Sequence, residues 1–150
     1  MPGDRLRRDA FVAAPMTAGG MGRPHEEIVA IIQAWSTNGR IISMPGMTAK
    51  SPPDLNAIET AACFVLVYPR KVASSALVEI GYAIACGKPS LILVHSIEDL
   101  PYFFRDVSES GFQGGSQGQV PPIRIVAFDT PEEAIEAGEL FFGELGSAGG

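Results

Sequence analysis

Residues 73–93 read ASSALVEIGYAIACGKPSLIL, and this stretch decides the fold. Ser74 and Ser75 favour the start of a helix. The apolar residues that follow continue the helix, and Gly87 is suited to end it. Pro89 then leads into the apolar run of a strand. The stretch therefore predicts a helix followed directly by a strand, which is the repeating pattern of an α/β protein.

Glu79 lies inside this apolar helix, and no other acidic residue occurs between Glu59 and Glu98. A carboxylate held among apolar side chains loses hydration, which disfavours its charged form. In one interpretation, Glu79 faces solvent on the polar edge of the helix or pairs with a distant arginine. In the other, it points into a cleft, where it binds or attacks a substrate. The helix has little other polarity, so the pattern favours the second interpretation.

The whole chain alternates strands with helices. Strands are predicted at 9–15, 40–45, 62–68, 90–95 and 123–128, and helices at 24–37, 52–61, 74–86, 97–107 and 130–145. This order predicts an α/β, flavodoxin-like fold of three layers, with a five-stranded parallel sheet and helices on both faces. We expect residues 9–145 to form this single domain, with a disordered tail at 1–8 and a flexible tail at 146–150.

Two helices carry local signals of their own. Trp35 ends an apolar stripe at helical spacing after Ile28, Ile31 and Ile32, so we expect it in the core. Residues 130–133 read TPEE, a helix start with a threonine cap, proline in the first turn and acids after it.

The topology also predicts where a ligand binds. In parallel α/β sheets, ligands bind outside the carboxyl ends of the strands, at the switch point in strand order. In a flavodoxin-like order the first and third strands flank that point, and the third strand leads to the Glu79 helix. The glycine-rich residues 16–23 form either a plain connection or a loop over a ligand with Arg23 as an anion partner, and the two interpretations are equally supported. The candidate substrate-binding residues at this edge are Pro15, Met16, Thr17, Arg23, Tyr68, Ser74 and Ser75.

Composition limits the function classes. The chain has 150 residues, 46% of them hydrophobic and 19% charged, with a net charge of −6. A nucleic-acid binder would show a basic face, and basic residues cluster only at Arg5, Arg7 and Arg8. The sequence lacks a secretory pattern and a membrane-length apolar run, which favours a cytoplasmic protein.

The sequence shows no pattern for a metal. Cys63 and Cys86 lack CxxC or Cys/His zinc spacing, so both are predicted to be reduced core residues. His25 and His95 are each interpreted as lone histidines without a nucleophile and acid to form a triad. We therefore expect no metal and no cofactor, with a small nucleotide or nucleoside as the ligand.

Three segments together resemble a known family. FVAAPM at 11–16, IETAACFVLVYP at 58–69 and SSALVEIGYAIACGKPSLILV at 74–94 resemble nucleoside 2-deoxyribosyltransferases and the related bacterial TIR domains. The resemblance covers roughly residues 9–107, and E-x-G-Y-A-x-A-x-G-K-P at 79–89 is its most specific part.

This resemblance implies a flavodoxin-like sheet and a glutamate that acts on an N-glycosidic bond. It makes Glu79 the candidate catalytic residue. In the transferases the corresponding glutamate is a nucleophile at the anomeric carbon, and in TIR enzymes it engages the ribose next to nicotinamide in NAD. Tyr82, one turn later, is interpreted as a core residue or a wall of the cleft.

The sequence departs from the transferase pattern at three positions. Phe11 stands where that family usually has a tyrosine, and Ala73 and Cys63 stand where it often has aspartates. These differences favour cleavage of NAD or a related nucleotide over nucleobase exchange. By the resemblance, Ser74 and Ser75 would contact the ribose and residues 17–23 would cover the phosphates.

Alternatives to this enzyme remain open. One is a nucleoside 2-deoxyribosyltransferase or nucleotide N-glycosidase, whose missing partners come from another subunit. A second, from a different class, is a non-catalytic nucleotide-binding or assembly module. A homo-oligomer that associates through the Glu79 helix, where Gly81, Ala83 and Ala85 are small, is a further hypothesis.

Overall fold

A computed structural model describes residues 8–15, 23–43, 53–71, 75–101, 104 and 123–149. The strands are β1 (Arg8–Ala13), β2 (Ile42–Ser43), β3 (Ala61–Tyr68), β4 (Ser90–Val94) and β5 (Ile123–Ala127). The helices are α2 (Arg23–Thr37), α3 (Pro53–Thr60), α4 (Ser75–Ala85) and α6 (Pro131–Gly149), with a 3-10 turn η1 at Ile97–Asp99.

The strands form one parallel sheet in the order β2-β1-β3-β4-β5. Four strands have five or more residues, and β2 adds two residues at the edge of β1. The predicted α/β fold with a parallel sheet is therefore confirmed. The order 2-1-3-4-5 places β1 and β3 side by side in the middle of the sheet.

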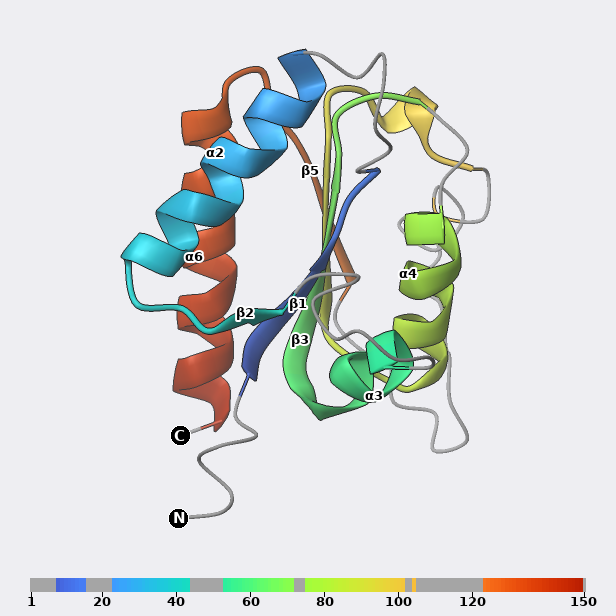
Figure 1. Cartoon of the computed structure of the whole chain (residues 1–150), viewed down its shortest axis with the longest axis vertical. Coiled ribbons are helices and arrows are strands. Elements are labelled where there is room, and N and C mark those ends of the chain that lie inside the picture. The colour runs from blue at the N-terminus through green and yellow to red at the C-terminus, as the bar shows by residue number, and fades with distance from the viewer. Residues whose placement is uncertain are drawn as a thin grey trace.

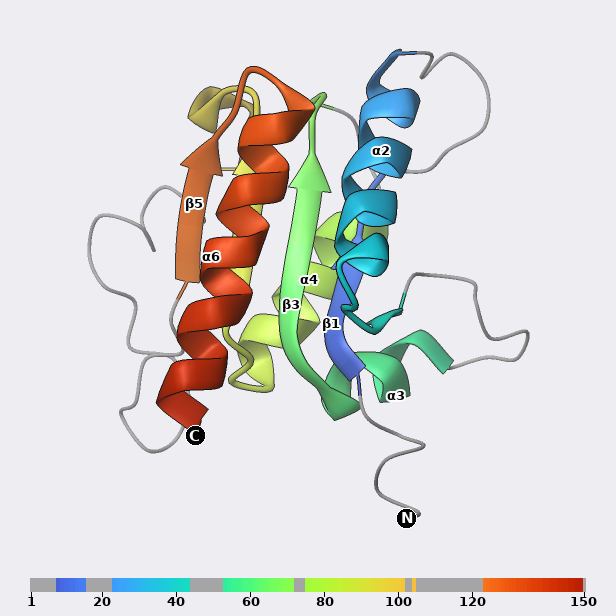
Figure 2. The same cartoon turned by 90° about the vertical axis from the view of Figure 1, so that its left-hand side faces the viewer.

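Helices cover both faces of the sheet. Figures 1 and 2 show α2 and α6 on one face, and Figure 1 shows α3 and α4 on the other. Side chains alternate along β3, so Val65 and Val67 pack toward α2 and α6, whereas Leu66 and Tyr68 pack toward α4. Each face consequently has its own apolar core.

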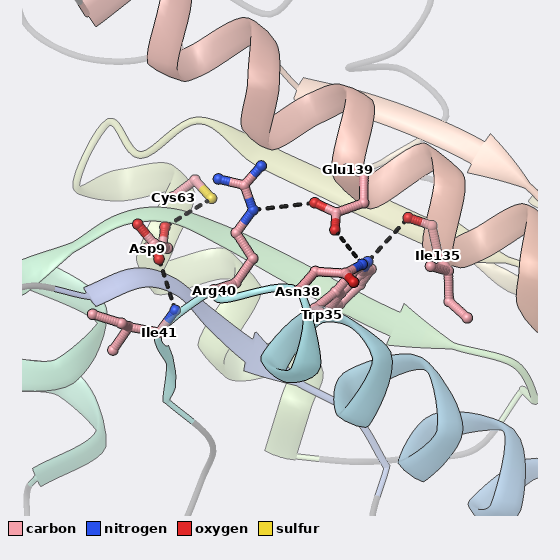
Figure 3. Close-up of polar contacts among 8 residues, drawn as sticks. All are labelled: Asp9, Trp35, Asn38, Arg40, Ile41, Cys63, Ile135 and Glu139. Carbon is pink, nitrogen blue, oxygen red and sulfur yellow. Dashed lines mark hydrogen bonds and ion pairs between the residues drawn. The ribbon is translucent and has the colours of Figure 1, made fainter.

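The α2/α6 face is built around Trp35, which is fully buried as predicted. Its indole N–H donates to the Ile135 carbonyl at 3.0 Å (Figure 3), and its ring meets Phe142 edge-on at 5.3 Å between centroids. A Cβ at Gly138 would lie 2.2 Å from Cζ2 of the Trp35 ring. The close approach of the two helices thus requires glycine at position 138.

A polar cluster continues this contact beyond the end of α2. Glu139 of α6 accepts from Asn38 at 2.7 Å and from Arg40 at 3.1 Å, and the Arg40 guanidinium lies 5.2 Å from the centroid of the Phe142 ring. Asp9 accepts from the Ile41 N–H at 2.7 Å (Figure 3). These bonds fix the far end of α2 near the start of β1.

The predicted cap of α6 is confirmed. The Thr130 hydroxyl accepts from the Glu133 N–H at 3.3 Å, and the Glu133 carboxylate accepts from the N–H groups of Thr130 and Asp129. These backbone bonds hold the pKa of Glu133 below its usual range.

Several element boundaries differ from those predicted. Of the strand expected at 40–45, Ile42 and Ser43 pair with β1, the Ile41 N–H bonds the Asp9 side chain just before them, and residues 44–45 lie outside the described residues. The helix expected at 97–107 begins as the 3-10 turn η1, and most of its remainder lies outside the described residues. The helix α6 extends to Gly149, beyond the end predicted at 145.

Candidate active site at the carboxyl edge of the sheet

The carboxyl ends of the strands meet at one edge, and the chain leaves them toward opposite faces. After β1 it continues to α2 on one face, and after β3 it continues to α4 on the other (Figure 1). The topological switch point therefore lies between β1 and β3, as expected. The register pairs Ala13 with Leu66, so Val67 and Tyr68 extend β3 beyond the end of β1.

Glu79 belongs to the buried stripe of α4, together with Ala76, Ile80 and Ala83. It is 7% exposed, and its Oε1 atom has almost no solvent-accessible surface. Among the described residues only Glu79 and Ser90 are buried polar side chains, and the Ser90 hydroxyl donates to the Lys88 carbonyl at 3.0 Å. The interpretation in which Glu79 faces solvent is thus wrong.

The buried stripe of α4 that holds Glu79 is otherwise apolar. Its neighbours in the stripe, Ala76 and Ile80, belong to the α3/α4 core, as do Ala13 of β1 and Tyr68 of β3. Val94, Leu100 and Phe104 complete this core toward the carboxyl ends of the strands. A low-dielectric wall strengthens the interaction of a carboxylate with a nearby positive charge, including one that develops on a substrate.

The start of α4 adds a favourable field. The helix begins at Ser75, which is exposed, and Glu79 follows in its second turn. The N-terminal end of a helix carries partial positive charge, which favours anionic groups of a ligand. Arg70 and Lys71, both exposed, follow the end of β3 at the same edge.

The predicted site residues divide into three groups. Pro15 and Tyr68, both buried, follow or end the central strands, and Ser75 begins α4, so these three accompany Glu79 at the carboxyl edge. Arg23 begins α2, but its side chain lies outside the described structure. Outside the described residues altogether are Met16, Thr17 and Ser74.

Tyr82 points to a different part of the molecule. Its hydroxyl donates to the Glu59 carboxylate at the end of α3, just before the amino end of β3. This bond to a carboxylate raises the pKa of Tyr82 above its usual range. In this structure, therefore, Tyr82 ties α4 to α3, and its hydroxyl is engaged away from the carboxyl edge.

Two of the three residues that depart from the transferase pattern, Phe11 and Cys63, are buried, and the third, Ala73, lies outside the described residues. Phe11 is stacked on Phe64 with centroids 5.7 Å apart, in the α3/α4 core. Cys63 belongs to the α2/α6 core and its thiol contacts the Asp9 carbonyl at 3.3 Å. Burial, with a smaller contribution from Asp9, raises the pKa of Cys63 to about 12. Cys63 is thus a protonated core thiol, as predicted, whereas the same prediction is wrong for Cys86, which is exposed where α4 ends.

Sequence reasoning missed a contact at the end of β4. His95 follows Val94 directly; its Nδ1 lies 2.8 Å from the Phe128 carbonyl and its Nε2 lies 3.3 Å from Oε1 of Glu27. Glu27 is 68 residues away in the chain, so no periodicity could reveal the pair. Both ring nitrogens are engaged with protein atoms, which leaves neither for acid–base work on a substrate.

Two findings bear on other kinds of site. Within the described part of the chain, no group of three or more histidine, cysteine or acidic side chains is arranged to hold a metal ion. None of the helices in that part has the length and apolar character to cross a membrane.

Comparison with known proteins gives a structural match. No family model matches the sequence, and no curated protein sequence matches it. A solved structure of similar fold is the Clostridium botulinum CMP N-glycosidase BcmB, with a TM-score of 0.60 and 19% identity, covering 87% of this chain and 98% of that chain. At this identity the likeness establishes the fold: the chain shares its α/β architecture with a CMP N-glycosidase.

Proposed function

We propose that the protein is an N-glycosidase that hydrolyses a nucleotide, with Glu79 as the catalytic carboxylate. The observation that carries the proposal is the burial of Glu79, in an apolar setting, on the helix that follows the switch point. A buried acid is costly to keep, and such groups concentrate at functional sites. The fold shared with a CMP N-glycosidase over 87% of the chain supports the same chemistry.

The proposed reaction breaks the bond between C1′ of the sugar and the base nitrogen. Positive charge develops on C1′ and the ring oxygen as an oxocarbenium-like state, and the base leaves with the electron pair and is protonated. The Glu79 carboxylate stabilises this charge directly or traps it as a glycosyl-enzyme ester. Water then adds its oxygen to C1′ and loses a proton, which gives a free sugar phosphate and a free base.

The other predicted residues have roles that follow from their place in the chain. Ser74 and Ser75, where α4 begins, would bind ribose hydroxyls or cap the helix. Pro15, Met16 and Thr17 would line the crevice after β1, and Arg23 would pair with phosphate. Tyr68 would form a wall of the crevice, whereas Tyr82, which bonds Glu59 away from this edge, would support α4 without contacting the ligand. A nucleoside monophosphate such as CMP is the favoured substrate, and NAD is the second.

The proposal includes three further claims. The fold is flavodoxin-like, the protein forms a homo-oligomer, and it is located in the cytoplasm. The strand order 2-1-3-4-5 supports the first of these. Small exposed residues on α4, such as Gly81 and Ala85, are compatible with association of copies.

The test is release of free base, followed by chromatography. Purified protein is incubated with CMP, dCMP, cytidine and NAD, and separately with a deoxynucleoside and a second free base. We expect free cytosine from CMP, and none from CMP with Glu79→Gln, while Glu136→Gln, an exposed acid of α6, keeps the rate. Exchange of bases would identify a transferase, and nicotinamide release would identify NAD as substrate. Thermal stabilisation by a nucleotide without any release would instead identify a binding module.

A further inference from the structure

We propose that Glu27 and His95 are positioning residues. Their contact holds the start of α2 against the carboxyl end of β4 and thereby sets the affinity of the crevice for nucleotide. The structural role of the Glu27–His95 contact does not depend on the function of the protein. Its effect on affinity rests on the proposed function, because it concerns the same crevice.

The pair joins elements that are distant in the chain. Glu27 lies in the second turn of α2, and His95 is the residue after β4. The carboxylate oxygen and Nε2 are 3.3 Å apart, and the two side chains are 15% and 31% exposed. Partial removal from water makes such a contact stronger than an ion pair on the open surface.

The chemistry of the ring makes this contact specific. Nδ1 of His95 faces the Phe128 carbonyl at 2.8 Å, and Nε2 faces the Glu27 carboxylate. Both partners are acceptors, so an imidazole with one proton would leave one nitrogen lone pair against an oxygen. A bond between Nε2 and the carboxylate therefore needs a proton between these two atoms.

The ring also joins the end of β4 to Phe128, the residue that follows β5. Its centroid lies 4.5 Å from that of Phe128, and the Phe128 N–H donates to the Val94 carbonyl at 2.8 Å. His95 is therefore held on two sides by the sheet and the residue after β5, and offers a fixed point to α2.

The Glu27–His95 contact lies at the same edge of the sheet as the crevice. The strand order places β3 between β1 and β4, so a contact from α2 to the end of β4 spans the carboxyl end of β3. Tyr68 and Pro69 lie at that end, next to the switch point. Ala14, directly after β1, belongs to the same apolar core as Ile28 in the second turn of α2, so the start of α2 also packs on the β1 side of the switch point.

The two ends of α2 are held by separate contacts. At its far end Trp35, Asn38 and Arg40 bond α6. Among the described residues, Glu27–His95 is the one side-chain ion pair that involves the first two turns of α2. Loss of the pair should therefore loosen the first turns and leave the far end in place.

The test compares Glu27→Gln, His95→Gln and the double variant with wild type at pH 6, where an ordinary imidazole is largely charged. Glu26→Gln is the matched control, since Glu26 is the exposed neighbour with the same charge. Amide hydrogen exchange measures how firmly the first turns of α2 are held. The KM and kcat for CMP measure the effect of the contact on substrate binding and turnover.

In both single variants we expect exchange at residues 27–31 to accelerate by about tenfold while exchange at 35–38 is unchanged. KM should rise roughly fivefold with kcat within about twofold, and the double variant should match the larger single effect because the residues act as one unit. Glu26→Gln should change neither quantity.

Unchanged exchange at residues 27–31 in both single variants would contradict the claim that the Glu27–His95 contact holds the start of α2. Faster exchange with an unchanged KM would overturn its role in affinity. If wild-type protein cleaves no nucleotide, the proposed function fails, and the dissociation constant of CMP then replaces KM: the same fivefold rise would support the role and no change would overturn it.

Discussion

The two helical layers use their polar groups differently. On the α2/α6 face, Trp35, Asn38 and Arg40 bond partners on α6, so polar atoms strengthen the packing of the layer. On the α3/α4 face, the carboxylate of Glu79 is buried among apolar side chains near the edge where ligands bind in such folds. The first arrangement is what stability alone favours. The second is the arrangement that the proposed function requires, because a carboxylate shielded from water interacts more strongly with charge that develops on a substrate.

The largest effect on stability is expected from Gly138→Ala. The new Cβ would lie 2.2–2.6 Å from three atoms of the Trp35 indole, which is flanked by Phe142 and cannot withdraw freely. We expect a loss of about 3 kcal/mol in the free energy of unfolding, measured by urea denaturation. Gly143→Ala, in the same helix with open space around the position, is the control and should gain about 0.5 kcal/mol. Equal effects at 138 and 143 would show that the two helices do not pack this closely.

A smaller effect is expected from Trp35→Phe. Phenylalanine keeps an aromatic ring but removes the N–H that donates to the Ile135 carbonyl and leaves part of the site unfilled. We expect a loss of about 2 kcal/mol, again by urea denaturation. Tyr82→Phe removes the hydroxyl that bonds Glu59 on the other face, and should cost less because that bond is exposed. A larger loss of stability for Tyr82→Phe than for Trp35→Phe would contradict the claim that polar bonds strengthen packing mainly on the α2/α6 face.

The smallest effect concerns alkaline pH and Cys63. Its pKa in the folded protein is about 12 against an ordinary value of 9.0. Because the folded pKa is raised, the stability from this thiol is complete below pH 9 and is lost as pH rises toward 12. By linkage, wild type should lose about 1 kcal/mol more than Cys63→Ala between pH 7 and pH 9.5. Identical pH profiles would show that the thiol is not shielded, and thiol titration should meanwhile modify only Cys86 in the folded protein.

Local pattern was enough to predict much of the fold. Strand–helix alternation gave the parallel sheet, helical spacing placed Trp35 in the core, and the TPEE sequence gave the cap of α6. A single acid in an apolar helix was enough to single out Glu79, since hydropathy reports burial before any fold is known. These features depend on neighbours a few residues apart, which is the range over which pattern carries information.

The remaining features depend on contacts between distant segments. Glu27–His95 and Tyr82–Glu59 join residues that no periodicity connects, and both were missed. The exposure of Cys86 depends on where α4 ends relative to its neighbours, which an apolar sequence does not specify. The bond from the Ile41 N–H to the Asp9 side chain, which precedes β2, forms only once β1 lies beside this segment.

The most direct measurement is the initial rate of base release from CMP, per folded molecule, for Glu79→Gln and Gly138→Ala beside wild type. If the α3/α4 face carries the chemistry and the α2/α6 face the packing, the free energy of unfolding of Glu79→Gln should lie within about 1 kcal/mol of the wild-type value. Its rate should fall at least a thousandfold, equivalent to about 4 kcal/mol in the barrier. Folded Gly138→Ala should keep a rate within about threefold of wild type. A Glu79→Gln rate within tenfold of wild type would contradict the account, because the buried carboxylate would then not act on the reacting sugar.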